Sequence, residues 1–243
     1  MQGLDAMGSI IDGFKKAFIL ILNLDKELLD IIFLSLRVSG SALLVSSAIG
    51  IPLAAIFGLK RFHGKGLIIS LLNTFMGLPP VVVGLFVYIF LSRSGPLGSL
   101  GLLYTPSAMV IAQTILALPI VVSLCSTAIV SVEPIIKQAS MTLGATPFQT
   151  YLTIIKEARY GILSGIVAAF GRIMAEVGAI LIVGGNIAGY TRVMTTTIAL
   201  ETDKGNFELA IALGIILLML SLVINAILHS IQGPPKKSWD LSG

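Results

Sequence analysis

Arg172 and Glu176 are the residues of this sequence that most strongly suggest chemistry, because they stand four positions apart inside an otherwise apolar stretch. On a helix this spacing places both side chains on one face, close enough to pair. A charge that faces hydrocarbon costs about 3 kcal/mol or more, so such side chains usually turn inward or toward a partner. Two interpretations follow: the pair lines or braces a route for an ion, or it neutralises itself and stabilises helix packing.

No other set of residues resembles a catalytic or metal site. Cys125 is the single cysteine, and the two histidines, His63 and His229, stand far apart. The run G-L-K-R-F-H-G-K-G at 58–66 resembles a phosphate loop only superficially, because Leu59 stands where the first glycine of that motif is needed. We therefore expect no enzymatic activity, no cofactor and no metal in this chain.

The composition is that of a membrane protein. Of the 243 residues, 56% are hydrophobic and 12% are charged, and the mean hydropathy is +0.99, whereas soluble domains carry about 25% charged residues. The apolar stretches lack the alternation required of barrel strands, so the predicted fold is all-α, a polytopic helical protein with a single transmembrane domain over residues 1–243. A helix of about 20 apolar residues crosses a bilayer. The five predicted spans are 31–58, 67–91, 106–131, 160–184 and 207–231.

Pro79 and Pro80 interrupt the second of these spans, beside Gly77 and Gly84. Proline removes a backbone hydrogen bond, which is tolerated where neighbouring helices or water in a cavity supply a partner. The pattern indicates a bent second span beside a polar pathway. A simple packing kink is the alternative.

The N-terminal segment 7–24 is amphipathic, with apolar residues at helical spacing opposite Asp12, Lys15 and Lys16. We interpret this segment as an interfacial helix that lies on the membrane lipid. A short sixth span is the alternative.

The distribution of Lys and Arg predicts the orientation, because basic residues are retained on the cytoplasmic side. The loops 59–66, 132–159 and 232–243 carry eight basic residues, whereas 92–105 and 185–206 carry three, or six with the N-terminal segment included. We therefore expect a cytoplasmic 132–159 loop and C terminus, an external 185–206 loop, and an N terminus outside. The same bias accounts for the net charge of +4 without any nucleic-acid partner.

The 132–159 loop carries the signals of two short helices joined by a tight turn. Gly144 accepts the left-handed conformation that ends a helix, and Thr146 with Gln149 forms a capping box at the start of the next one. A helix of about nine residues is about 13 Å long, so it cannot cross the hydrocarbon core of roughly 30 Å. Its apolar stripe is Phe148, Tyr151, Leu152 and Ile155. Such a helix suits a groove on another protein, and the alternative is a surface helix that only ties two spans together.

The order Gln138-Ala139-Ser140, three residues, Gly144, nine residues, Ile154 resembles the EAA loop of the permease subunits of type I ABC importers. That pattern is E-A-A, three residues, G, nine residues, I-x-L-P, and the sequence departs from it at Gln138, Ser140 and Lys156-Glu157. The resemblance implies the type I ABC importer permease fold, with 145–152 as a coupling helix that docks on a cytoplasmic ATPase subunit. The coupling residues are then Ala139, Gly144, Ala145, Thr146, Pro147, Phe148 and Tyr151.

A second stretch is similar to oxyanion permeases, namely A-E-V-G-A-I-L-I-V-G-G-N-I-A-G-Y-T-R at 175–192 followed by M-T-T-T-I-A-L-E-T at 194–202. Within that group the residues of this stretch most resemble those of tungstate permeases, and molybdate and sulfate permeases are near relatives. The resemblance covers the chain from about residue 30 to its end. It implies a homodimer in the cell inner membrane that receives an oxyanion from an external binding protein and is powered by two ATPase subunits.

Hydroxyls and free backbone amides beside glycines are suitable partners for an oxyanion that passes a gate, although a glycine-rich external turn has the same composition. The candidate pathway residues are Pro79, Pro80, Arg172, Glu176, Gly184, Gly185, Asn186, Thr195 and Thr196. The competing function is a self-sufficient secondary transporter or channel for a small anion. Such a protein is expected to show an inverted internal repeat, and the two halves of the sequence show no convincing likeness.

Overall fold

The computed structural model of the chain describes residues 12–20, 22, 26–60 and 62–232, and every regular element in these ranges is helical. The elements are α2 (Lys26–Leu59), α3 (Lys65–Met76), α4 (Pro80–Leu91), the 3₁₀ helix η1 (Gly98–Leu100), α5 (Pro106–Val130), α6 (Pro134–Thr142), α7 (Pro147–Glu157), α8 (Arg159–Met174), α9 (Gly178–Gly184), α10 (Met194–Asp203) and α11 (Phe207–Gln232). The predicted all-α fold is confirmed.

Three of the described helices, α2, α5 and α11, are long and apolar enough to cross a membrane. Two further segments are bent pairs: α3 and α4 meet at 98°, and α8 and α9 meet at 60°. Counting each bent pair as one span gives five spans, in agreement with the five predicted segments. The bend in the second segment is confirmed, whereas the break in the fourth is not anticipated by its sequence.

The break between α3 and α4 follows from local chemistry. Helix α3 ends at Met76, Pro79 is extended with φ −63° and ψ 119°, and Pro80 is the first residue of α4. Two consecutive prolines lack two backbone donors, and each restricts the residue before it to extended conformations. A continuous helix through this point is therefore excluded.

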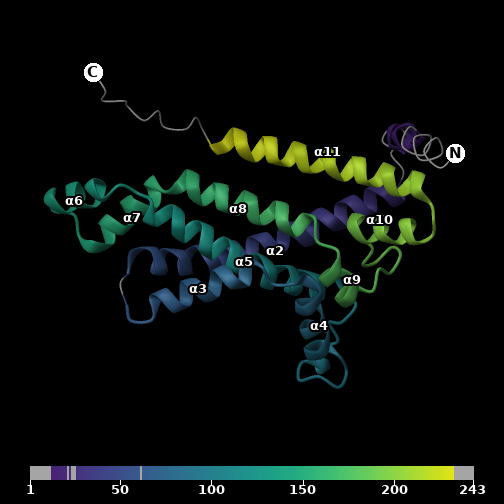
Figure 1. Ribbon diagram of the computed structural model, residues 1–243, viewed down its shortest axis with the longest axis horizontal. Helices are drawn as coiled ribbons and strands as arrows, with labels where there is room; N and C mark the ends of the chain where they lie inside the picture. The colour runs from purple at the N-terminus through teal and green to yellow at the C-terminus, as the bar shows by residue number, and fades with distance from the viewer. Residues whose placement is uncertain (1–11, 21, 23–25, 61, 233–243) are drawn as a thin grey trace.

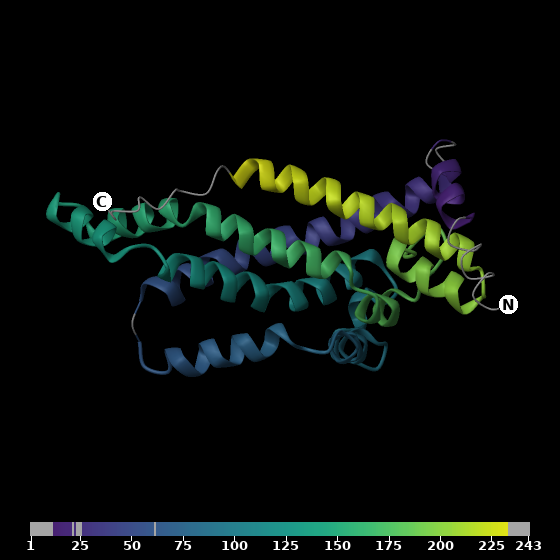
Figure 2. The same cartoon turned by 45° about the horizontal axis from the view of Figure 1, so that its top comes forward.

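Helix α5 lies at the centre of the bundle, next to α2 and α8 (Figure 1). In its most apolar window 61% of the residues are buried, against 22% for α2 and for α11. Figure 2 shows α11 and α3 on opposite sides of this centre. The outward faces of both are apolar, with Leu71 and Phe75 exposed on α3 and Leu218 and Leu222 exposed on α11. These faces suit contact with lipid or with another membrane chain.

The two loops of predicted functional interest lie toward opposite ends of the long axis (Figure 1). Helices α6 and α7, from the 132–159 loop, stand at one end, and α9 and α10 lie toward the other. The 185–206 segment is more ordered than a simple external loop, because half of it forms α10 and the three threonines that begin this helix are buried. The hydroxyls at this end therefore belong to a packed element.

The N-terminal segment 7–24 is described at residues 12–20 and 22, which are helical, and its remaining positions lie outside the described residues. Ala17 is buried in a cluster with residues of α2, α10 and α11. Phe14 and Phe18 are exposed on the other side of this helix. An apolar face directed outward suits an interfacial helix, and the placement on the membrane surface stays a prediction.

Helices α4 and α9, the second members of the two bent pairs, pack against each other at unusually close range. A Cβ atom on Gly84 would lie 2.8 Å from the Cα atom of Ala179, and a Cβ atom on Gly178 would lie 2.7 Å from Cγ2 of Val81. Distances this short leave no room for a side chain, so the two glycines permit the contact. The region around it is a core cluster that also includes Val83, Val87 and Ile180.

We expect Gly84→Ala to destabilise the protein, because the new methyl group meets the backbone of α9 and not a flexible side chain. Overpacking of this kind costs about 1–3 kcal/mol, and each kcal/mol lowers the melting temperature by about 2–4 °C in a protein of this size. Thermal unfolding of the purified protein in detergent measures the shift.

Gly214→Ala is the matched control, because Gly214 lies in α11 with nothing within 4 Å of the position of its Cβ atom. Alanine is the better helix former by about 1 kcal/mol, so its melting temperature should stay the same or rise. Equal destabilisation by the two substitutions would show that the α4–α9 contact is not tight.

Candidate functional site

The turn between α6 and α7 has the predicted geometry. Gly144 follows the end of α6 with φ +81°, in the left-handed region, and Pro147 is the first residue of α7. The amide of Gln149 donates to Oγ1 of Thr146 at 3.3 Å, and the amide of Thr146 donates to Oε1 of Gln149 at 2.8 Å. The capping box is therefore complete, and it fixes the direction in which α7 leaves the turn.

Helix α7 turns one face to the protein and another to the outside. Thr150 and Ile154 are buried against the bundle, whereas the side chain of Phe148 is 70% exposed and that of Leu143, in the turn, is 87% exposed. The large apolar side chains exposed on α6, α7 and their turn are Ile135, Met141, Leu143, Phe148 and Leu152. We call this set the coupling surface, after the role that the sequence predicts for it. Exposed lysines on α6 and α7 show that this end of the molecule is compatible with water.

The other predicted coupling residues lie around this surface. Ala139 and Thr146 are exposed, and Ala145 and Tyr151 are half-buried. The predicted stripe of α7 is thus divided, because Phe148 and Leu152 are available for contact while Tyr151 turns partly toward the protein.

Arg172 and Glu176 pair at the break between α8 and α9. Nη1 of Arg172 donates to Oε2 of Glu176 at 2.9 Å, and Oε1 of Glu176 accepts from the amide of Ala179 at 3.2 Å. The carboxylate is only 4% exposed, while the arginine side chain is 42% exposed. Glu176 is therefore held from two sides, and it holds Arg172 at the edge of the bundle.

Two polar side chains from other helices donate hydrogen bonds to backbone carbonyls at the break. Nε2 of Gln113, on α5, donates to the carbonyl of Ile173 at 3.0 Å and to Oγ of Ser39 at 3.3 Å. Oγ1 of Thr195, on α10, donates to the carbonyl of Glu176 at 2.9 Å. Backbone carbonyls that lack a helical hydrogen bond inside a membrane need donors from elsewhere in the protein. The break therefore depends on residues that are distant in the sequence.

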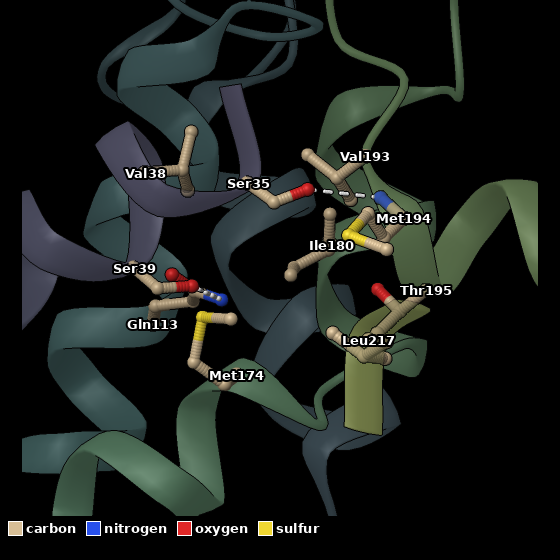
Figure 3. A pocket seen from close by; sticks show the side chains of 10 residues that line it. All are labelled: Ser35, Val38, Ser39, Gln113, Met174, Ile180, Val193, Met194, Thr195 and Leu217. Carbon is tan, nitrogen blue, oxygen red and sulfur yellow. Dashed lines mark hydrogen bonds between the residues drawn. The ribbon is translucent and has the colours of Figure 1, made fainter. Parts of the chain in front are cut away.

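A small cavity lies beside these contacts (Figure 3). It is lined by Gln113, Ser39, Ser35 and Thr195 together with apolar neighbours. Its volume of about 10 Å³ is close to the smallest that holds one water molecule. Oε1 of Gln113 is buried and has no hydrogen-bond partner among the described residues. Ser35 bridges helices instead, because its Oγ accepts from the amide of Met194 at 2.9 Å and donates to the carbonyl of Ile31.

The candidate residues of the 184–196 segment are engaged in folding that segment. Oγ1 of Thr196 accepts from the amide of Val193 at 3.1 Å, and Nδ2 of Asn186 points to the carbonyl of Thr196 at 3.5 Å. Gly185 has φ +71° and packs on the ring of Tyr104. Thr195, Thr196 and Gly184 are buried, and at the first break Pro79 is exposed while Pro80 is half-buried. The nine candidate pathway residues thus lie at two separate breaks and in the 184–196 segment.

Residues 50–233 match the profile of the family described as binding-protein-dependent transport system inner membrane component. The chain belongs to this family. A probable anion ABC transporter permease protein of Haloferax volcanii is 47% identical over 205 residues, which cover 82% of this chain and 88% of the relative. A tungstate uptake system permease protein of Peptoclostridium acidaminophilum is 43% identical over 226 residues, which cover 93% and 99%. The solved bacterial ABC transporter that imports the acidic polysaccharide alginate matches with a TM-score of 0.72 at 21% identity, over 94% of this chain and 88% of that one.

This inner membrane component therefore has the fold of ABC importer permeases, as its EAA-like loop and its oxyanion-permease segment imply. Its relatives are named as permease proteins of an anion ABC transporter and of a tungstate uptake system. The predicted membership in the type I ABC importer permeases is confirmed.

Gln113 is a fully buried amide at the centre of this permease, and it is not among the residues that the sequence predicts for the site. The available signal is its polarity within the apolar 106–131 stretch. Ser35 and Ser39 are also missed, because single serines are common in membrane helices and carry little information alone.

We expect Thr195→Val to loosen the break, because valine keeps the shape but leaves the carbonyl of Glu176 without its donor. An unsatisfied buried carbonyl costs about 1–3 kcal/mol. Hydrogen–deuterium exchange should accelerate at the amides of residues 175–179. In the control Thr202→Val, also on α10, the lost hydroxyl is exposed and bonded to the carbonyl of Ile198, so exchange at 175–179 should not change. Unchanged exchange in both variants would show that Thr195 does not hold the break.

Proposed function

We propose that this chain is the membrane-spanning subunit of an ABC importer that carries tungstate, or the related oxyanion molybdate, into the cytoplasm. Two relatives named as tungstate uptake permeases, 43% and 40% identical over 93% and 92% of this chain, support the substrate. A molybdenum transport permease of Haemophilus influenzae is more distant, at 31% identity over 65% of the chain. The selectivity among oxyanions then depends mainly on an external binding protein.

The coupling surface is the observation that carries this function. Large apolar side chains exposed on short water-side helices mark a docking site for another protein. The chain has no phosphate loop of its own, so we assign ATP hydrolysis to two cytoplasmic ATPase subunits. Each ATPase subunit would receive the coupling surface of one permease chain in a groove.

The buried side of α7 offers a mechanical connection from that groove to the bundle. Ile154 of α7 packs in one cluster with Ile162 of α8 and with Cys125 and Ile129 of α5. Close-packed interiors are stiff and transmit displacement. A movement imposed on Phe148 would therefore pass through Ile154 into the two central helices.

A second copy of this chain completes the proposed transporter. Five spans are few for enclosing a pathway, and α3 and α11 leave apolar faces open that a partner chain or lipid can cover. The proposed route runs between two copies, past the break at Pro79 and Pro80, the pair Arg172 and Glu176, and the outer segment. The outer members of this route are Gly184, Gly185, Asn186, Thr195 and Thr196.

The proposed orientation places the coupling surface in the cytoplasm and the N terminus outside. The excess of basic residues in the 59–66, 132–159 and 232–243 segments supports this orientation. The end of the molecule that carries α9 and α10 would then face the external binding protein.

We expect Phe148→Asp to lower ATP-driven uptake of radiolabelled tungstate at least tenfold in vesicles that contain the permease, its ATPase and its binding protein. The side chain is exposed, so the fold is preserved, but a carboxylate in an apolar groove is strongly disfavoured. The amount of ATPase that co-purifies with the permease should fall in parallel.

Leu97→Asp is the control, because Leu97 is also exposed but lies in the 92–105 segment, away from α6 and α7. It should retain the ATPase. Full retention of ATPase and uptake by Phe148→Asp would contradict the role of the coupling surface. If the unmodified complex takes up tungstate without ATP, or takes up neither tungstate nor molybdate, the proposed function is wrong.

The orientation can be measured with cysteines introduced into a Cys125→Ala background, which removes the buried native thiol. In intact cells that lack the ATPase, a membrane-impermeant maleimide should label Ser99→Cys at once. The exposed Leu143→Cys should be labelled only after the membrane is opened. The reverse pattern would invert the proposed topology.

A further inference from the structure

Arg172 lies deep within the membrane-spanning part of the chain. It stands thirteen residues after Arg159, the start of α8, which is about 20 Å along the helix. The carbonyl of its neighbour Ile173 accepts a hydrogen bond from Gln113, which lies seven residues, or about 10 Å, from the start of α5. These two estimates place the guanidinium within the hydrocarbon core, which is about 30 Å thick.

The guanidinium is nevertheless directed out of the bundle, since the arginine side chain is 42% exposed and its partner Glu176 is 4% exposed. The exposed positions of α8 on the approach to Arg172 are small residues, Ser164, Ala168 and Gly171, and nothing lies within 4 Å of a Cβ atom on Gly171. A cation at this depth does not face lipid without a large cost. This open face of α8 therefore borders either water or a second protein chain.

The donors of Arg172 are mostly unused. A guanidinium carries five N–H groups, and within the described part of the chain only the bond from Nη1 to Glu176 is found. The remaining donors form a planar fork that matches the oxygens of a tetrahedral oxyanion. Glu176 cannot turn away to release the arginine without losing its bond to the amide of Ala179.

We propose that Arg172 binds the oxyanion during its passage through the membrane, and that Glu176 is the positioning residue that fixes the guanidinium. This inference rests on the proposed function and specifies the contact that the anion makes.

The carboxylate of Glu176 serves a second purpose, because it cancels most of the arginine charge. An uncompensated cation in a low dielectric would hold a divalent anion too strongly for release, whereas a compensated one offers directed donors and weak net attraction.

The competing explanation is a purely structural ion pair, and the double variant Arg172→Gln with Glu176→Gln separates the two. The amide oxygen introduced at position 176 can still accept from the amide of Ala179, and the two new side chains can bond to each other. The local hydrogen bonds therefore remain while both charges disappear. Removing both partners also avoids the uncompensated buried charge that makes the loss of one partner strongly destabilising. We expect the variant to assemble with its ATPase and to melt within a few degrees of the parent, but to transport tungstate at least tenfold more slowly.

Arg172→Lys provides the graded comparison, because it keeps the charge but loses the planar fork. Its uptake should lie between that of the parent and that of the double glutamine variant. Parent-like uptake by the double variant would overturn the inference while leaving the importer intact. Absence of uptake of tungstate, molybdate and sulfate by the parent complex would instead overturn the proposed function.

A direct measurement covers the case in which the double variant fails to assemble. Phenylglyoxal modifies accessible arginines, and mass spectrometry of the complete parent complex reports the extent at each position. Tungstate should protect Arg172 at least threefold relative to chloride, while Arg93, in the exposed 92–105 segment, should be modified equally in both. Equal modification of Arg172 with and without tungstate would refute direct contact.

Discussion

The structure depends on the requirement that each backbone carbonyl inside a membrane find a donor within the protein. The fourth span breaks within the membrane-spanning part of the chain, where the carbonyl of Ile173 accepts from Gln113 and the carbonyl of Glu176 accepts from Thr195. These donors come from α5 and α10, so the break can exist only if both helices pack beside it. The central position of α5 and the return of α10 toward the bundle follow from this requirement.

The same requirement separates the molecule into two kinds of structure. Near α6 and α7 the helices are stopped and started by local signals, namely a left-handed glycine and a reciprocal cap, and most of their large apolar residues are exposed, although Ile154 is buried. Near α9 and α10 the elements are held by contacts over long sequence distances, such as the bond from Met194 to Ser35. The proposed importer would need a stiff connection between its ATPase and the membrane-spanning helices, and the cluster around Ile154 would supply the inner part of that connection.

Sequence reasoning succeeds wherever the cause is local. The capping box at Thr146, the left-handed Gly144 and the bend at Pro79 and Pro80 each depend on residues a few positions apart, and all are confirmed. The break at residues 175–177 contains no proline, and its donors lie about sixty positions before it and about twenty positions after it, so no periodicity reveals it. Helix α10 is hidden for a related reason, since threonines and glycines are typical of loops until the cap from Thr196 to Val193 and the bond to Ser35 fix them.

The close approach of Gly84 to Ala179 joins α4 and α9, the segments that follow the breaks in the second and fourth spans. Rotation of either helix alone would separate a contact that has no side chain to fill the resulting gap. The two breaks are therefore linked, because α4 and α9 keep this contact only if they move together. In the proposed importer, a gate built from these two segments would open or close as a whole, which would reduce the number of half-open states through which ions could leak.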